Sequence, residues 1–180
     1  MAVKGKTKSG NSERQIARFF TKWLTGQDKV LHFWRSPGSG AVATVNLGNK
    51  AISGDLMALK PESSFFTDMF SVEVKDGYAG TDIFQLLKGN KNFNLEAFWV
   101  QCTRDAYDHE KLPLLLWKKK GGLWTASVDD KGFELFCCGS TLPFVSVTWA
   151  PETRLPTLHM FNMKDLFDLF KPEDIKNVKL

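Results

Sequence analysis

The 180 residues of this chain are enough to bury one full hydrophobic core. A hydrophobic fraction of 43% and an aromatic fraction of 13% exclude an intrinsically disordered chain, and no stretch reaches the roughly 18 apolar residues of a membrane-spanning helix. The net charge of +4 permits nucleic-acid binding without requiring it. The polar N-terminus lacks the apolar stretch of a signal peptide, so we expect a cytoplasmic protein with no membrane partner.

The chain begins with a lysine-bearing segment of low hydrophobicity. Lys4, Lys6 and Lys8 lie among glycine and serine residues. We predict that residues 1–10 form a disordered basic tail whose lysines bind phosphate groups, with a solvated tail as the alternative. Residues 11–180 are predicted to form a single domain.

A helical pattern follows the tail. Ser12 is a suitable N-cap for a helix over residues 13–24, and Gly26 would end it. The apolar positions with helical spacing are Ile16, Phe19, Phe20, Trp23 and Leu24. After this helix, residues 30–34 predict a strand, residues 35–40 (RSPGSG) a loop, and residues 41–47 a further strand or irregular segment.

Two strand-like segments then carry charged side chains. Residues 51–59 predict a strand that contains Asp55, and residues 65–75 contain the next strand. Side chains alternate along a strand, so Val72 and Val74 face one side while Glu73 and Lys75 face the other.

The rest of the chain mixes helical and strand patterns. We predict helices over residues 81–88 and 95–109, and strands over residues 113–118, 123–128, 133–136, 144–149 and 157–161. Asn162 would cap a closing helix that ends near Phe170. This order favours an α/β domain, in which helices pack on a mixed β-sheet.

One group of side chains suits metal-assisted phosphate chemistry. Asp55 and Glu73 on neighbouring strands supply the carboxylate oxygens that Mg²⁺ prefers, and Lys75 lies on the same face as Glu73. A bound cation activates water and neutralises phosphate charge, while a lysine orients the water. The alternative is a Glu–Lys salt bridge on an exposed strand, but the flanking Val72 and Val74 favour a central strand.

The pattern Gly54-Asp55 followed by Glu73-Val74-Lys75 resembles the PD-(D/E)xK nuclease superfamily, with Gly54 in place of the usual proline. The resemblance implies a restriction-endonuclease-like core: a mixed β-sheet flanked by helices in α-β-β-β-α-β order. It extends over about residues 11–90 and is closest to Holliday junction resolvase-like endonucleases of phage or archaeal type. Their helix-borne glutamate matches Glu13, and their arginine and small-residue loop matches the segment 35–40.

The resemblance also implies roles. Asp55 and Glu73 would bind Mg²⁺, with Mn²⁺ as a substitute and the Val74 carbonyl as a third ligand, and Lys75 would position the water. Glu13 would bind the metal directly, through water or as part of a second ion site; an ordinary helix-opening glutamate is its alternative. Gln85 would contact DNA or, alternatively, orient Lys75. The other predicted DNA contacts are Arg35, Ser36, Ser39 and the tail residues Lys4, Lys6 and Lys8.

We therefore expect a metal-dependent endodeoxyribonuclease that cuts branched DNA as a homodimer, in the host cytoplasm if a phage encodes it. The alternatives are a restriction- or repair-type endonuclease with the same core and an inactive DNA-binding module. Hydrophobic residues near the C-terminus (Phe161, Leu166, Phe167 and Phe170) offer material for a dimer interface or, alternatively, pack on the domain's own sheet. Trp117 and Trp124 flank a KKKGG turn, where they would either stack on unpaired bases or build core.

Overall fold

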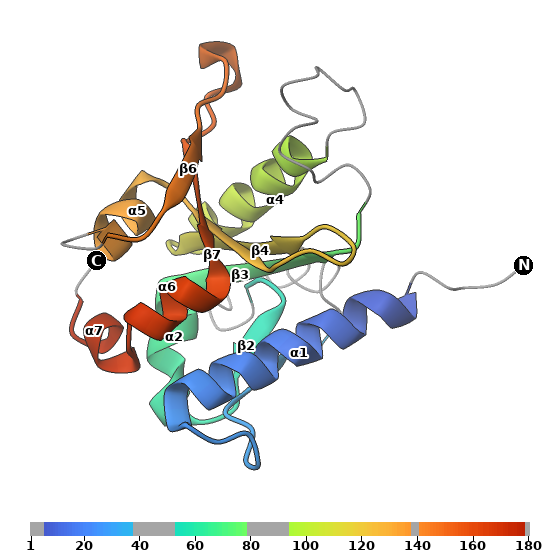
Figure 1. The fold of residues 1–180 in the computed structure, drawn as a ribbon, viewed down its shortest axis with the longest axis vertical. Helices are drawn as coiled ribbons and strands as arrows, with labels where there is room; N and C mark the ends of the chain where they lie inside the picture. The colour runs from blue at the N-terminus through green and yellow to red at the C-terminus, as the bar shows by residue number, and fades with distance from the viewer. Residues whose placement is uncertain (1–5, 38–52, 79–93, 138–140, 179–180) are drawn as a thin grey trace, which may run out of the picture.

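A computed structural model describes residues 6–37, 53–78, 94–137 and 141–178 (Figure 1). A five-stranded sheet lies at the centre, with helices on both faces. Its strand order is β3-β4-β5-β7-β6. The five strands are β3 (Phe70–Asp76), β4 (Leu112–Lys118), β5 (Thr125–Val128), β6 (Phe144–Val147) and β7 (Leu158–Asn162).

The sheet is mixed. Strands β3 and β4 are parallel, while β4–β5, β5–β7 and β6–β7 are antiparallel pairs. Helix α4 (Leu95–Tyr107) packs against both β3 and β4, as expected for the crossover that a parallel pair requires. The protein thus has the predicted α/β architecture of a restriction-endonuclease-like core.

The two faces of the sheet bury separate hydrophobic clusters. On β4, Leu114 and Leu116 point to the larger cluster, which also contains buried residues of α1, α2, α5 and α6, whereas Leu115 and Trp117 point to the smaller cluster under α4. The alternation predicted for β3 is confirmed, since Val72 and Val74 lie in the larger cluster. This separation leaves Glu73 on the face that α4 covers.

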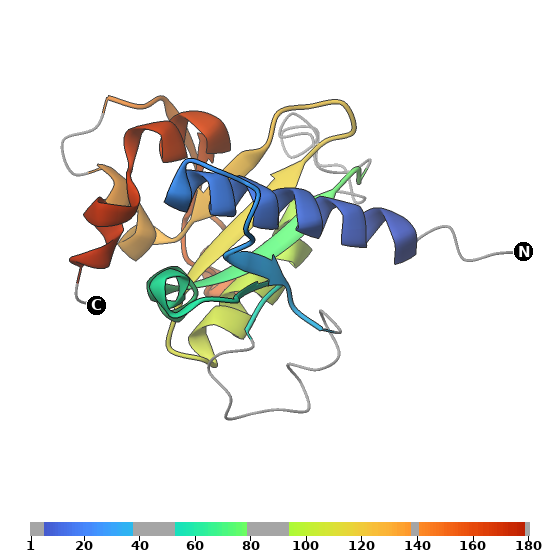
Figure 2. The ribbon, with the colours of Figure 1, turned by 90° about the horizontal axis from the view of Figure 1, so that it is seen from below.

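Helix α1 (Lys6–Thr25) runs across the face of the sheet that lies opposite α4 (Figure 2). Its Ile16, Ala17 and Phe20 are fully buried, and the Phe20 ring lies 4.5 Å from the ring of Phe66 and 5.0 Å from that of Phe167, between centroids. These contacts bury the apolar stripe that the sequence predicted.

The predicted boundary of the basic tail is wrong. The helix begins at Lys6 instead of residue 13, so residues 6–10 are helical and Ser12 is an interior residue, not the cap. Glycine and serine weaken a helix by only about 1 kcal/mol or less per residue. Tertiary packing of the following apolar stripe is enough to extend the helix backward through them.

A smaller two-stranded sheet precedes the central one. Strands β1 (Phe33–Arg35) and β2 (Leu56–Ala58) are antiparallel. Both are shorter than the segments predicted as strands, 30–34 and 51–59, and Asp55 lies just before β2. The predicted segments 41–47 and 81–88 lie outside the described residues.

One short segment predicted as a strand is helical: residues 133–136 belong to α5 (Asp130–Cys137). The stretch before β3 forms a 3-10 turn (Pro61–Ser63) and α2 (Ser64–Met69). Asp129 caps α5, because its Oδ1 accepts a hydrogen bond of 2.9 Å from the Gly132 N–H. The phenylalanines in both segments suit a strand or a helix, and tertiary burial decides between them.

The end of the chain follows the prediction closely. Asn162 caps α6 (Met163–Leu169), since its side chain accepts hydrogen bonds from the backbone N–H groups of Lys164 and Asp165. Helix α7 (Pro172–Lys176) follows. No helix within the described ranges is both long and apolar enough to cross a bilayer.

Candidate active site

A close backbone contact fixes Asp55 beside β3. Its N–H donates to the Val72 carbonyl at 2.6 Å, and its Oδ2 accepts from the Val74 N–H at 2.9 Å. Gly54 forms an isolated parallel bridge to Val72. The carboxylate is therefore held against β3 by the strand's own main chain.

The close approach of the main chain at position 54 to β3 requires a glycine. Its φ is +77°, and a Cβ at this position would lie 2.4 Å from the Val72 carbonyl oxygen. Proline fixes φ near −65°. The usual superfamily proline is therefore incompatible with the backbone here, which explains its replacement by glycine.

Glu73 and Lys75 lie together on the α4 face of β3. The Lys75 ammonium is 2.5 Å from Glu73 Oε1, donates to Gln101 Oε1 at 3.0 Å, and lies 5.2 Å from the centre of the Phe98 ring. Both Phe98 and Gln101 belong to α4. The predicted alternation thus brings the carboxylate and the lysine together, and α4 completes the lysine's surroundings.

Gln101 is the functional candidate that sequence reasoning missed. The resemblance implies that Gln85 either contacts DNA or orients Lys75, and Gln85 lies outside the described residues. A usable signal existed, because Gln101 is a polar residue beside Trp99 and Cys102 on the buried side of a predicted helix.

Glu13 approaches from α1 and pairs with Arg35 of β1. Glu13 is only 3% exposed, and its Oε2 lies 3.3 Å from Arg35 Nε. Gly10, one turn earlier, leaves room for the arginine, since a Cβ there would come within 2.5 Å of Arg35 Nη1. The two predicted site residues therefore lie side by side at the active-site end of α1.

The other residues predicted to contact DNA lie in different parts of the structure. Ser36 is buried, and its N–H donates to the Asp55 carbonyl at 3.0 Å. It therefore supports the loop that holds Asp55. Lys6 and Lys8 lie on the first turn of α1. Three further predicted residues lie outside the described ranges: Lys4, Ser39 and Gln85.

The site concentrates negative charge in a buried place. Burial, followed by repulsion from Glu73, raises the pKa of Asp55 to about 8, although the Val74 N–H opposes the shift. Burial also raises the pKa of Glu73 while Lys75 opposes it. For Lys75, burial lowers the pKa, but the contact with Glu73 outweighs this and the net shift is upward.

This donor set fits a hard divalent cation. Two buried carboxylates that repel each other gain most from a shared positive charge, and Mg²⁺ is commonly held by one or two carboxylates with water and phosphate. Among the residues described, no group of three or more acidic, histidine or cysteine side chains is close enough to hold a metal. Glu13 pairs with Arg35 instead, so its role as a direct third ligand gains no support.

A family model described as "Phage putative PDDEXK endonuclease" matches residues 4–177. The chain belongs to this family. The match extends beyond the segment 11–90 that carried the resemblance, and it confirms the assignment to the PD-(D/E)xK nucleases. In this member of the family, Asp55, Glu73 and Lys75 lie at the junction of the small sheet, β3 and α4.

The chain is also similar to Protein D14 of Escherichia phage T5. The two are 31% identical over 130 residues, which cover 72% of this chain and 74% of that protein. No solved structure matches.

Proposed function

We propose that this phage PDDEXK protein is a Mg²⁺-dependent endodeoxyribonuclease that hydrolyses phosphodiester bonds in branched DNA. The buried cluster of Asp55, Glu73 and Lys75 carries the proposal. It combines two oxygen-donor side chains with one cation at the edge of a sheet, and nothing in the core packing requires these charges.

Asp55 and Glu73, with the Val74 carbonyl, would hold the metal. When bound, a divalent cation activates water and neutralises charge that builds on the phosphate. The Val74 N–H fixes the orientation of Asp55, so this carboxylate is positioned before substrate arrives. Such preorganisation lowers the cost of reaching the transition state.

Lys75 would position the attacking water. An ammonium group has three donors and no acceptor. Glu73 and Gln101 accept two of them, which leaves the third to donate to a water or a phosphate oxygen. Gln101 thereby acts as a positioning residue, because it fixes where the remaining N–H bond points.

Branched DNA is favoured by the resemblance to Holliday junction resolvases, which rests on Glu13 and Arg35. Their ion pair places a cation next to the carboxylates, where it can contact the phosphate beside the scissile bond. A restriction- or repair-type activity would use the same cluster on other DNA. An inactive binding module would have little use for two buried carboxylates that repel phosphate.

The test is a cleavage assay on four-way junctions, flaps and linear duplex, each with Mg²⁺, Mn²⁺, Ca²⁺ or excess EDTA. We expect cutting with Mg²⁺ and Mn²⁺, no turnover with Ca²⁺ or EDTA, and a preference for the junction. Equal cutting of all three DNAs would favour the restriction- or repair-type alternative. Full activity in EDTA would contradict the metal assignment, and binding without cutting would support the inactive module.

A further inference from the structure

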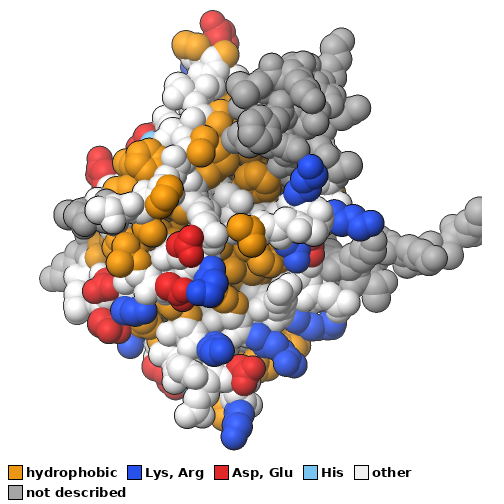
Figure 3. Space-filling view, viewed as in Figure 1, with side chains coloured by type: hydrophobic (Ala, Val, Ile, Leu, Met, Phe, Trp, Pro, Cys, Tyr) orange, Lys and Arg blue, Asp and Glu red, His pale blue; other side chains and the backbone are white. Residues whose placement is uncertain are grey.

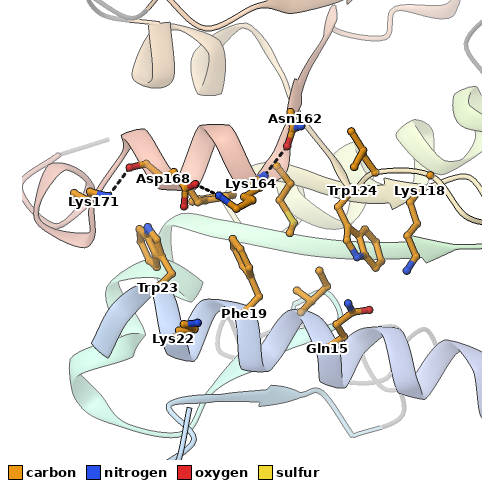
Figure 4. A pocket seen from close by; sticks show the side chains of 15 residues that line it. Gln15, Phe19, Lys22, Trp23, Lys118, Trp124, Asn162, Lys164, Asp168 and Lys171 are labelled. Carbon is orange, nitrogen blue, oxygen red and sulfur yellow. Dashed lines mark hydrogen bonds and ion pairs between the residues drawn. The ribbon is translucent and has the colours of Figure 1, made fainter. Parts of the chain in front are cut away.

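A groove of about 730 Å³ separates α1 from α6 and from the turn between β4 and β5 (Figure 4). Phe19, Lys22 and Trp23 enter it from α1, Lys164 from α6, and Trp124 from the position just before β5. The groove lies on the opposite face of the sheet from α4. It is distinct from the active-site cluster.

The groove is basic. Four lysines line it (Lys22, Lys118, Lys164 and Lys171), against one acidic side chain, Asp168. Lys164 pairs with Asp168, and Lys171 donates to the Asp168 carbonyl. Lys22 has no ion pair or side-chain hydrogen bond to any residue that the structure describes. On the face shown in Figure 3, lysine and arginine side chains gather over α1, with hydrophobic side chains beside them. Such a surface suits an anionic ligand with apolar parts.

Trp124 gives the groove an aromatic wall. The Lys118 ammonium lies 4.5 Å from the centre of its ring, and the neighbouring Leu123 is 77% exposed. Trp124 is half-buried, and its indole N–H finds no acceptor within the described ranges. Trp117, on the other side of the KKKGG turn, is buried and donates to Ser127 Oγ at 2.9 Å. Trp117 is therefore a core residue, whereas Trp124 is available for stacking.

A chain of contacts at the end of β3 connects the groove to the active-site strand. Asp76 directly follows Lys75 on β3, and its Oδ2 accepts a hydrogen bond from Ser12 at 2.5 Å and lies 3.4 Å from Lys118 Nζ. Ser12 precedes Glu13 on α1, and Lys118 lines the groove. A strand that leaves the active site past the end of β3 therefore meets the groove at Lys118.

We propose that this groove binds an unpaired DNA strand next to the cleavage site, an inference that rests on the proposed nuclease function. Unpaired bases expose the faces that stack on an indole ring, whereas a duplex hides them, and lysines along the groove contact the phosphates. The stretch of α1 from Gln15 to Trp23 spans about 12 Å at 1.5 Å per residue. That length is enough for a few nucleotides of an unpaired strand. The groove would then bind the single-stranded arm of a branched substrate, such as a flap.

The experiment compares a duplex that carries a single-stranded tail with the matching blunt duplex. Binding is measured by fluorescence anisotropy in EDTA at several salt concentrations, so that no strand is cut. The groove variants are Trp124→Ala and Lys22→Gln. The controls are Trp149→Ala, which removes another half-buried indole, and Lys131→Gln, which removes an exposed charge from α5; neither residue lines the groove.

We expect Trp124→Ala to weaken binding of the tailed duplex by about 5- to 100-fold, with blunt-duplex binding unchanged. Lys22→Gln should lower the salt slope for the tailed duplex by about 0.7, the value for one single-strand phosphate contact. If Trp124→Ala does not fold, the salt slope of Lys22→Gln decides the matter. Equal losses on both DNAs, or losses no larger than in the controls, would overturn the proposal.

Failure of the groove and failure of the nuclease function give different results. In one outcome, the wild-type protein binds blunt duplex and cuts it with Mg²⁺, and the groove variants behave like wild type on both DNAs. This outcome contradicts the groove proposal alone. A wild-type protein that binds neither DNA contradicts both.

Discussion

The candidate active site depends on a few atoms at the edge of one strand, β3. Asp55 uses one carboxylate oxygen to accept from the Val74 N–H, which leaves the other for a metal ion. Glu73 and Lys75 are two residues apart on the same face, so a single strand presents opposite charges at a fixed spacing. Geometry at this scale determines what each substitution should do.

The first prediction concerns the three central side chains. Asp55→Asn, Glu73→Gln and Lys75→Ala should each lower kcat by at least about 100-fold, because each removes a group that acts on the transition state. DNA affinity should change little, because lysine and arginine contacts to phosphates supply it. Single-turnover cleavage and anisotropy measure the two effects. Glu62→Gln on the exposed 3-10 turn is the control, and near-wild-type turnover by a folded central variant would remove that residue from the site.

The second prediction follows from the raised pKa of Asp55. The folded protein holds this proton up to about pH 8, whereas the unfolded chain releases it near 3.8. The folded state therefore binds more protons between these values, and stability falls as the pH rises through this range. In EDTA, the wild-type Tm should drop between pH 5 and pH 8 by more than that of Asp55→Asn, which has no proton to lose there. Parallel Tm profiles for the two proteins would contradict the assignment.

The third prediction tests Gln101. Gln101→Met keeps the side-chain length but removes the acceptor for Lys75, so kcat should fall by about 10-fold, as is typical of residues that support a functional group. KM and Tm should stay close to wild type, since DNA contacts and core packing are retained. Steady-state kinetics and thermal melting distinguish this from a structural role, in which Tm would fall together with kcat.

Among the elements, the junction of the small sheet with β3 is the most constrained. Gly54 combines a left-handed φ with a main-chain approach to Val72 that no side chain permits. Helix α4 constrains the same strand from the other side through Phe98 and Gln101. Contacts on both sides of β3 therefore fix the positions of Asp55 and Lys75 relative to this strand.

The fourth prediction compares two glycines of similar φ. Gly54→Ala should destabilise the protein by more than about 3 kcal/mol, because strain at positive φ adds to a direct clash with backbone atoms. Gly77 has a φ of +76°, but a Cβ at this position would meet no atom within 4 Å, so Gly77→Ala should cost only about 1 kcal/mol. Urea denaturation measures both. Equal losses would mean that the close approach at Gly54 is unimportant.

At the scale of the whole molecule, most of the C-terminal hydrophobic residues that could have formed an interface are used internally. Phe161, Leu166 and Phe167 are at most 2% exposed and lie in the larger core cluster. Two adjacent hydrophobic side chains, Phe144 and Val145, are about half exposed on β6, at the end of the strand order. This edge is the surface that a dimer would use.

The fifth prediction is therefore a homodimer through β6. A four-way junction offers two equivalent strands, which suits two active sites related by a two-fold axis. Sedimentation at micromolar concentration should show a dimer in the wild type and a monomer in Val145→Lys, because a charge on an edge strand opposes pairing. Val100→Lys, an exposed position on α4, is the control. A wild-type monomer with and without junction DNA would exclude the dimer.

The arrangement of Glu73 and Lys75 on β3 could be predicted from the sequence because strand alternation is a local property. Glu73 and Lys75 share a face at a spacing that any extended segment produces, and the flanking valines indicate which face is buried. Strand alternation could not predict that Gln101 contacts Lys75, because this contact joins α4 to β3 through tertiary packing. The helical nature of α5 was missed for a related reason: four residues are too few to show a period, and the Asp129 cap lies outside them.

The attachment of Asp55 to β3 has a consequence for the dynamics of catalysis. The small sheet that carries this carboxylate joins β3 through the Gly54–Val72 bridge and the two hydrogen bonds of Asp55. Local opening at this contact would separate the two carboxylates while the five-stranded sheet stays folded. The fraction of molecules able to cut DNA is then set by the free energy of this local opening, which is smaller than that of global unfolding.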